Sequence, residues 1–139
     1  MAKHPTGWLE EEELTHAVIG AFFTVHNTLG FGFLERVYAH ALQVELELRG
    51  HRVVREYPVT VIYRGVEVGR HRLDLVVDNK IVLETKSSEQ LPRDYTRQLY
   101  NYLKATTFEV GLLLHFHRRA DFYRIIFKNK DKAARSASR

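Results

Sequence analysis

A predicted β-hairpin constrains the fold of this chain more strongly than any other feature of its sequence. Residues 73–77 and 81–85 are short apolar segments rich in β-branched side chains, and three residues, 78–80, separate them. Side chains alternate between the two faces of a strand, so a slip of one residue would move every apolar side chain to the opposite face. Pairing Leu75 with Leu83 keeps apolar side chains together and leaves a three-residue loop, which is a common length in hairpins.

The same register brings charged side chains to one place. It sets Asp74 directly opposite Glu84, with Lys86 two residues further on the same face. Opposed residues have Cβ atoms roughly 5 Å apart, and two ionised carboxylates this close repel each other. A divalent cation would relieve that repulsion, and Mg²⁺ prefers such hard oxygen ligands. The alternative is a cluster of ion pairs on a solvated sheet face that includes Arg72, and the trio alone does not decide between the two.

Hydrophobic periodicity along the rest of the chain predicts a mixed α/β domain. Helical spacing of apolar residues indicates helices over residues 14–25 and 34–48, and a third helix is expected to begin near Pro92. Short β-branched segments, separated by turn residues such as Pro58, indicate strands at residues 53–54, 59–63, 66–68, 73–77, 81–85, 108–116 and 122–127. Since helices and strands do not alternate strictly, we expect an α/β fold with a mixed central β-sheet flanked by helices, two of them N-terminal.

Composition excludes several classes of protein. The 139 residues suffice for one compact domain. There are no cysteines, which excludes disulfides, a thiol nucleophile and cysteine-ligated zinc. No apolar run is long enough for a transmembrane helix, and the first residues lack a signal-peptide pattern, so no membrane association and a cytoplasmic location are expected.

The net charge of +4 suggests a nucleic-acid partner, but the basic excess lies in the last twelve residues. Residues 128–139 contain five Lys or Arg and one Asp, while residues 1–127 contain 16 basic and 16 acidic groups. We therefore expect a single domain over residues 1–127 and a basic, flexible tail over residues 128–139. A tail that binds nucleic acid is the alternative interpretation.

Two motifs resemble those of the PD-(D/E)XK nuclease superfamily. Asp74, followed after nine residues by Glu84-Thr85-Lys86, reads as the D-x₉-E-x-K form of its signature. On the following predicted helix, Gln98 and Tyr102 match the Q-xxx-Y element of several branches. The resemblance implies a restriction-endonuclease-like (PD-(D/E)XK) core.

A third motif narrows this resemblance. Residues 32–38 read as G-xx-E-xx-Y, so the chain is similar to the GxxExxY family of the superfamily, from about Val18 to Phe127. Two positions differ from the family pattern. Thr85 stands where an apolar residue is usual, and His115 stands where Asn is common.

The resemblance implies a metal-dependent nuclease that hydrolyses phosphodiester bonds of nucleic acid, with DNA the favoured substrate. Asp74, Glu84 and the backbone carbonyl of Thr85 would bind Mg²⁺ or Mn²⁺, which would activate a water molecule. Lys86 would orient that water or stabilise the developing negative charge. Glu35, in the first turn of the second helix, would be a further metal ligand, unless it only compensates the positive end of the helix dipole.

The remaining candidates have supporting roles. Gln98 and Tyr102 lie one turn apart on a helix; Gln98 would position the water or a phosphate oxygen, and Tyr102 would support it. Arg93 and Arg97 could contact phosphates or could lie on a solvated helix face.

Two residues of the early helices are also candidates for supporting roles. Tyr38 is expected to be a core aromatic residue near the site. His26 is either a structural histidine at a helix end or a metal ligand. His115 and His117 share a strand face, but no third ligand is evident for a metal there.

Two other functions are compatible with the sequence. The chain could be a catalytically silent module of the same fold that binds nucleic acid or a protein. It could also be a phosphodiesterase that acts on nucleotides or on another substrate that is not nucleic acid. The balanced charge of residues 1–127 favours these alternatives slightly, because phosphate binding normally uses clustered Lys and Arg. A homodimer or a protein partner could supply missing substrate contacts.

Overall fold

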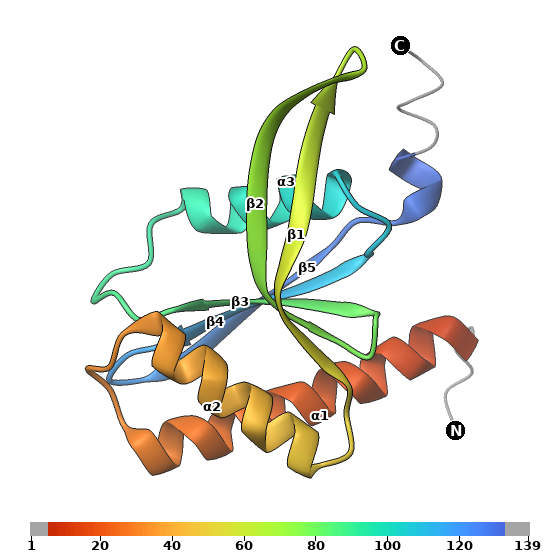
Figure 1. The fold of residues 1–139 in the computed structure, drawn as a ribbon. Helices are drawn as coiled ribbons and strands as arrows, with labels where there is room; N and C mark the ends of the chain where they lie inside the picture. Colours follow the sequence, from red (N-terminus) through yellow and green to blue (C-terminus); the bar gives the residue numbers. More distant parts are fainter. Residues whose placement is uncertain (1–5, 133–139) are drawn as a thin grey trace.

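The computed structural model describes residues 6–132, and side chains from residue 11 onward. In the described residues, three helices and five strands make up the fold, and one further helical turn lies at residues 129–132 (Figure 1). They are α1 (Thr6–Leu29), α2 (Glu35–Leu48), β1 (Val53–Tyr63), β2 (Val66–Val77), β3 (Ile81–Lys86), α3 (Asp94–Lys104), β4 (Val110–Phe116) and β5 (Ala120–Ile126). This order confirms the two predicted N-terminal helices. The third helix, predicted to begin near Pro92, begins at Asp94.

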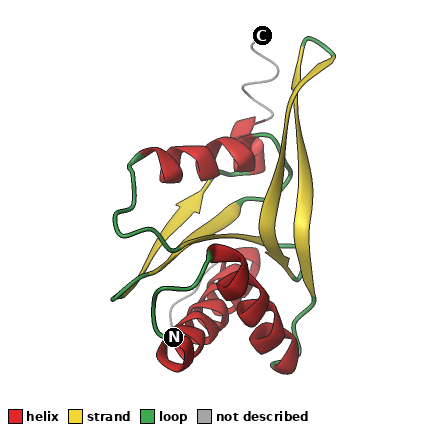
Figure 2. Cartoon of the chain, turned by 60° about the vertical axis from the view of Figure 1, so that its left-hand side comes forward, coloured by secondary structure: helices red, strands yellow, loops and turns green. Residues whose placement is uncertain are grey.

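The strands form one mixed sheet with the order β1-β2-β3-β4-β5. Strands β3 and β4 are parallel, and all other neighbours are antiparallel. Helices α1 and α2 cover one face of the sheet, while α3 lies on the other face, where it connects the two parallel strands (Figures 1 and 2). The expected architecture, a mixed sheet flanked by helices, is confirmed.

Four predicted strands are in fact two long ones. Residues 53–54 and 59–63 belong to β1, and residues 66–68 and 73–77 belong to β2. The prediction that Pro58 ends a strand is wrong. Pro58 lies inside β1 and pairs with Arg72 of β2. Strand β1 is an edge strand of the sheet, and edge strands tolerate proline because the backbone on their outer side needs no hydrogen-bond partner.

Both faces of the central strands are buried, which explains why these strands read as continuous apolar runs. Leu75 and Leu83 pack with α1 and α2, whereas Val76 and Val82 pack with α3. On β4, Gly111 permits the close approach of α3, because a Cβ there would lie 3.0 Å from Leu99 Cδ1. The sheet is therefore held between two hydrophobic layers.

The hairpin of β1 and β2 bends sharply near the middle. Glu56 has a positive φ of 56° and lies between the pairs Arg55–Leu75 and Tyr57–Leu73, level with Asp74. Beyond this bend, the outer part of the hairpin, residues 57–73, projects past the sheet alongside α3 (Figures 1 and 2). We call this segment the arm.

The structure describes only the first part of the predicted C-terminal tail, residues 128–132. Asn129 donates hydrogen bonds to Glu109 Oε2 at 2.7 Å and to the carbonyl of Thr107 at 2.9 Å. Lys132 Nζ donates to the carbonyls of Thr106 and Phe108. Residues 128–132 therefore contact the body of the domain, and the rest of the expected tail lies outside the described residues. No helix in the described part of the chain is long and apolar enough to cross a membrane.

Candidate active site

The observed pairing of β2 with β3 confirms the predicted hairpin register. Leu75 pairs with Leu83, and residues 78–80 form the loop between the strands. The ladder of paired residues stops at this point, and Asp74 and Glu84 come directly after it on their two strands. Hydrophobic pairing alone thus brings the two carboxylates to neighbouring positions.

Where β2 and β3 separate, hydrogen bonds from backbone N–H groups to the two carboxylates take the place of backbone hydrogen bonds between the strands. Asp74 Oδ2 accepts a hydrogen bond from the N–H of Thr85 at 2.7 Å and another from the Thr85 hydroxyl at 2.9 Å. Glu84 Oε1 accepts a hydrogen bond from the N–H of Asp74 at 3.0 Å. Each carboxylate is therefore held by the opposite strand. The family pattern usually has an apolar residue at the position of Thr85. The hydroxyl of Thr85 orients Asp74, which gives this departure a structural role.

Glu84 is an ionisable group in an unfavourable environment. Its side chain is almost fully buried, with only 5% of the residue surface exposed. Burial raises the pKa of the Glu84 carboxyl above its ordinary value of 4.5; the charge of Asp74 adds to the rise, and contacts with His71 and the Asp74 N–H oppose it. A cation beside Glu84 would compensate the cost of burying its charge and reduce the repulsion from Asp74.

The donor set suits a hard divalent cation that also binds water or substrate. Asp74 and Glu84 provide carboxylate oxygens, and Thr85, the residue after Glu84, provides a backbone carbonyl. Within residues 11–132, no three His, Asp or Glu side chains come together to hold a metal, so Glu35 does not form such a group with the two carboxylates. Mg²⁺ often binds through one or two carboxylates and completes its coordination with water and phosphate oxygens. The residues present therefore fit Mg²⁺ or Mn²⁺.

Lys86 lies against an aromatic ring that sequence reasoning did not identify. Its Nζ is 4.2 Å from the centroid of the Tyr95 ring, which is a cation–π contact. Tyr95 is in the first turn of α3, so the end of β3 and the start of α3 are linked through this pair. The contact restricts the ammonium group to the α3 side of the sheet.

His71 is a second residue that the sequence did not indicate. Its Nε2 lies 3.5 Å from Glu84 Oε1, and its ring stacks on Tyr102 with centroids 3.9 Å apart and an angle of 4°. Strict alternation along β2 would place His71 on the face opposite Asp74. The bend at Glu56 breaks that alternation and turns the arm toward α3, so no signal in the sequence could have placed His71 here.

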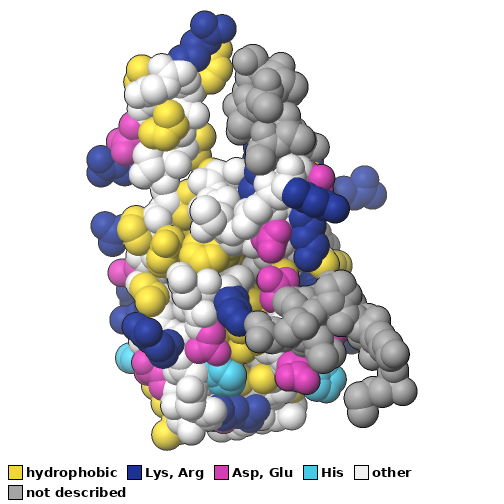
Figure 3. Space-filling model, turned by 90° about the vertical axis from the view of Figure 1, so that its right-hand side faces the viewer, with side chains coloured by type: hydrophobic (Ala, Val, Ile, Leu, Met, Phe, Trp, Pro, Cys, Tyr) yellow, Lys and Arg dark blue, Asp and Glu magenta, His cyan; other side chains and the backbone are white. Residues whose placement is uncertain are grey.

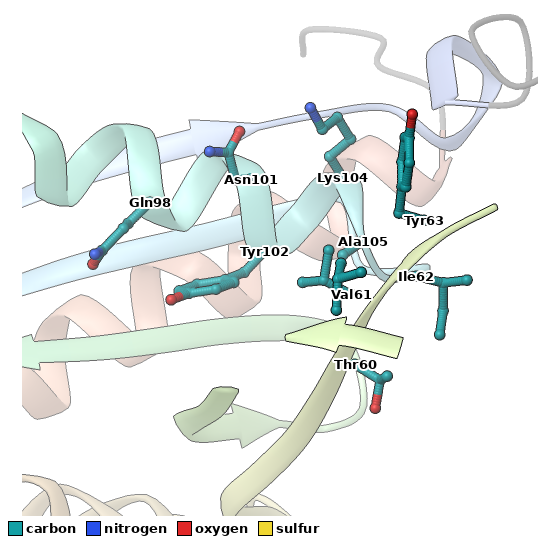
Figure 4. Close-up of a pocket in the computed structure, with 10 residues that line it drawn as sticks. Thr60, Val61, Ile62, Tyr63, Gln98, Asn101, Tyr102, Lys104 and Ala105 are labelled. Carbon is teal, nitrogen blue, oxygen red and sulfur yellow. The ribbon is translucent and has the colours of Figure 1, made fainter. Parts of the chain in front are cut away.

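Tyr102 stacks on His71 and also lines a groove beside the arm (Figure 4). Burial, and to a lesser extent the charge of Glu84, raises the pKa of the Tyr102 phenol above its ordinary value of 10.0. Gln98 lines the same groove, which confirms that these two α3 residues face the same side. The groove has a volume of about 890 Å³. It lies between arm residues Thr60, Val61, Ile62, Tyr63 and Val68 and α3-side residues Gln98, Asn101, Tyr102, Lys104 and Ala105.

The G-xx-E-xx-Y motif forms the turn between α1 and α2. Tyr38 is fully buried, stacks on Phe116 at 4.3 Å, and donates a hydrogen bond to the carbonyl of Gly30 at 2.8 Å. Its hydroxyl also accepts the N–H of Phe33 at 3.3 Å. Tyr38 is thus a core aromatic residue that closes the turn, as predicted, and Glu35 is the half-buried first residue of α2.

The histidines near the end of β4 make structural contacts. His26 Nε2 donates to the carbonyl of His117 at 2.6 Å, and His115 Nε2 donates to the carbonyl of Ser88 at 2.6 Å. These hydrogen bonds occupy one ring nitrogen of each residue. The hydrogen bond to His117 therefore supports a structural role for His26.

The two arginines predicted to meet phosphates lie on the surface around α3. Arg93 directly precedes the helix and is exposed. Arg97 is exposed and places its guanidinium 4.9 Å from the centroid of the Tyr100 ring. Neither arginine lines the groove beside the arm.

Comparison with known proteins identifies a family for this chain. A family model described as the PD-(D/E)XK nuclease superfamily matches residues 12–125. No curated protein matches the sequence. One similar solved structure, described as the crystal structure of SSO0001, has a TM-score of 0.48 and 20% sequence identity; the alignment covers 98% of this chain and 84% of that chain.

Proposed function

The chain belongs to the PD-(D/E)XK nuclease superfamily, and from this premise we propose that it is a metal-dependent nuclease of the GxxExxY family. It would hydrolyse phosphodiester bonds of nucleic acid, with DNA the favoured substrate. One observation carries the proposal. Asp74 and Glu84 are held side by side by the backbone of the opposite strand, and Glu84 is buried with a raised pKa. Such a pair of carboxylates is unfavourable without a cation and suitable for binding one.

The metal ligands would be the carboxylates of Asp74 and Glu84 with the backbone carbonyl of Thr85. When bound, Mg²⁺ or Mn²⁺ would supply an activated water molecule and shield the charge of the scissile phosphate. The Thr85 hydroxyl keeps Asp74 in position, and His71 lies beside Glu84. These contacts prepare the site before the substrate arrives.

Lys86 and Gln98 would act on the substrate. The Lys86 ammonium, positioned by the Tyr95 ring, would stabilise negative charge that develops on the phosphate oxygens. Gln98, exposed at the end of the groove nearest the candidate site, would hold a phosphate oxygen or the water by hydrogen bonds. Tyr102 supports the arrangement through its stacking with His71. We assign Glu35 no metal contact, because within residues 11–132 it does not come together with Asp74 and Glu84 as a group of three metal-binding side chains.

A cleavage assay tests the proposal. Plasmid DNA, single-stranded DNA and RNA would each be incubated with Mg²⁺ or Mn²⁺, with and without chelator. Lys86→Ala and Asp74→Ala should lower the cleavage rate by about 100-fold or more. Lys130→Ala, at an exposed lysine near the C-terminal end of the described chain, should leave the rate unchanged. Equal cleavage by the wild type and both site variants would refute the proposed site.

A further inference from the structure

The groove between the arm and α3 is a surface that phosphodiester hydrolysis alone does not explain. Its arm side presents four exposed apolar or aromatic side chains, Val61, Ile62, Tyr63 and Val68. Hydrophobic side chains are visible along the arm in Figure 3, with a basic side chain at its tip. Contiguous exposed apolar surface of this kind marks a contact site in a folded protein.

The inner end of the groove reaches the candidate active site. Gln98 and Tyr102 belong to both, and in Figure 4 the Tyr102 hydroxyl points toward the Gln98 end of the groove. The Tyr102 ring stacks on His71 at 3.9 Å, and His71 lies 3.5 Å from Glu84. A molecule lying along the groove would therefore end one aromatic ring away from a carboxylate of the site.

The chemistry of the lining distinguishes between forms of nucleic acid. A duplex presents two rows of phosphates, and proteins bind it with clustered Lys and Arg. The groove has one cation, Lys104, among its lining residues. It has instead an exposed ring, Tyr63, and two amides, Gln98 and Asn101, which can both donate and accept hydrogen bonds. Unpaired bases offer apolar faces for stacking and polar edges for hydrogen bonds.

We propose that the groove binds the unpaired bases of a single-stranded nucleic acid, with the strand backbone directed toward Asp74 and Glu84. The proposal rests on the nuclease function proposed above and specifies the form of its substrate. The bases would lie between the apolar side of the arm and α3, with Tyr63 as a stacking ring and Lys104 near one phosphate. A flap, an overhang or a free strand would satisfy this requirement.

Binding can be measured apart from cleavage. Fluorescence anisotropy would compare a labelled single-stranded oligonucleotide with a blunt duplex of the same length, in the presence of chelator. The single strand should bind more tightly. Tyr63→Ala should weaken its binding on the order of tenfold, because stacking on one aromatic ring is lost. Tyr123→Ala is the matched control, since Tyr123 is also an exposed tyrosine but lies on β5, outside the groove.

The outcomes separate this proposal from the nuclease proposal. Tighter binding of the duplex, or single-strand binding that Tyr63→Ala and Lys104→Ala leave unchanged, would overturn the groove proposal even if metal-dependent cleavage is found. Conversely, Tyr63-dependent binding of the single strand without cleavage under any metal condition would support the groove and refute the nuclease. Circular dichroism of each variant would show that the fold is retained.

A different observation concerns the outer face of α2. Its inner face, which includes Tyr38, Leu42 and Leu46, is buried against the core. A second apolar row, however, faces solvent with the alternating three- and four-residue spacing of a helix–helix seam. This row consists of Leu34, Val37, Ala41, Val44 and Leu48; Ala41 is partly buried against the core, and the other four are exposed, Leu48 to 78%. A hollow of about 500 Å³ lies beside Ala41, where the small side chain permits close approach of another element.

The charges beside this row are complementary under a two-fold rotation. Arg36, which lines the hollow, lies in the N-terminal half of α2, whereas Glu47 lies in the C-terminal half. An antiparallel pair of α2 helices would bring each Arg36 toward Glu47 of the other copy and join the two apolar rows. We infer that a second copy of this chain binds here, α2 against α2, as a two-fold dimer.

Sedimentation velocity over a range of protein concentrations tests the dimer. The wild type should dimerise, and Val44→Glu should be monomeric at every concentration, because it places a charge in the apolar row. Arg36→Glu should weaken the dimer, and the double variant Arg36→Glu with Glu47→Arg should restore it. A wild type that is monomeric throughout, or a dimer that Val44→Glu leaves intact, would overturn the inference. Val54→Glu, at an exposed valine that does not line the hollow, is the control.

Discussion

At the level of single residues, burial of the Glu84 charge opposes folding, and the proposed metal ion would compensate for that cost. The Glu84 carboxyl is buried beside Asp74, and these two conditions raise its pKa. Active sites commonly keep such unfavourable groups because function requires them. The same residue should therefore have opposite effects on stability and on metal binding.

Glu84→Gln separates these two effects. The amide keeps a carbonyl that can accept the Asp74 N–H but removes the buried charge. In chelator at neutral pH, the variant should be more stable than the wild type by about 1 kcal/mol in its free energy of unfolding. Added Mg²⁺ should raise the melting temperature of the wild type and leave that of Glu84→Gln unchanged. Urea unfolding and thermal denaturation measure both effects. A variant that is less stable in chelator and still responds to Mg²⁺ would contradict the prediction.

Asp78 acts in the opposite sense, as a carboxylate that stabilises the hairpin loop. Burial opposes its ionisation, but the hydrogen bonds from His51 and from the Arg52 N–H outweigh burial and lower the pKa of Asp78 below its ordinary value of 3.8. A carboxyl group whose pKa is lower in the folded state stabilises the fold above its unfolded pKa. That contribution is lost as the pH falls through the folded pKa.

Asp78→Asn should therefore destabilise the protein near neutral pH and have a smaller effect in acid. Urea unfolding of the wild type and the variant at pH 6 and at pH 3 would measure the difference between them at each pH. The gap should narrow at the lower pH because the carboxyl of the unfolded chain, whose pKa is the higher one, takes up a proton there and removes part of the stabilisation by ionised Asp78. Asp121→Asn, at an exposed aspartate on β5, is the control. A gap that is constant with pH would show that ionised Asp78 does not contribute.

At the scale of secondary-structure elements, the bend in β1 decides which strand residues meet α3. Before the bend, Leu75 packs with α1 and α2; beyond it, Val59 and Leu73 pack with α3. Glu56 provides the bend through its left-handed backbone, φ 56°. This conformation is costly for most residues and least favourable for β-branched ones.

Substitutions at Glu56 test this role. Glu56→Gly should change the free energy of unfolding by less than about 1 kcal/mol, because relief of the left-handed strain offsets the greater flexibility of glycine. Glu56→Val should lower it by roughly 1–2 kcal/mol. The ion pair of Glu56 with Arg72, 3.8 Å long and exposed, should matter little in either variant. Equal effects of Gly and Val would argue against a left-handed residue at the bend.

For the whole molecule, the distribution of charge predicts how substrate binding responds to salt. Residues 1–127 carry equal numbers of acidic and basic groups, and the candidate groove has one lining cation. Lys104 in the groove and Lys86 at the candidate site would therefore neutralise about two phosphates. Between 50 and 200 mM salt, the affinity for a single strand should fall by about 20-fold or less, whereas six to ten phosphate contacts would cost about 10³-fold or more. Anisotropy titrations at several salt concentrations give the slope, and a steep slope would indicate a basic surface elsewhere in the chain, such as residues 128–139.

The sequence by itself determined the helices, the central hairpin and the centre of the candidate site. Hydrophobic pairing set the register of β2 with β3, and that register alone placed Asp74 beside Glu84, because the two residues are only ten positions apart in a hairpin. Helical spacing likewise placed Gln98 and Tyr102 on one side of α3. These predictions depend on local periodicity, which can be read without knowledge of the rest of the fold.

Only the tertiary structure decided what surrounds the two carboxylates. His71 reaches Glu84 because the backbone bends at Glu56, against the alternation expected of a straight strand. Tyr95 reaches Lys86 because α3 packs across the sheet next to Gly111. Contacts between elements distant in sequence depend on how those elements pack, and the period of a single segment does not contain that information. The pair of carboxylates is thus a local property of the sequence, whereas the groove that leads to it is a property of the assembled fold.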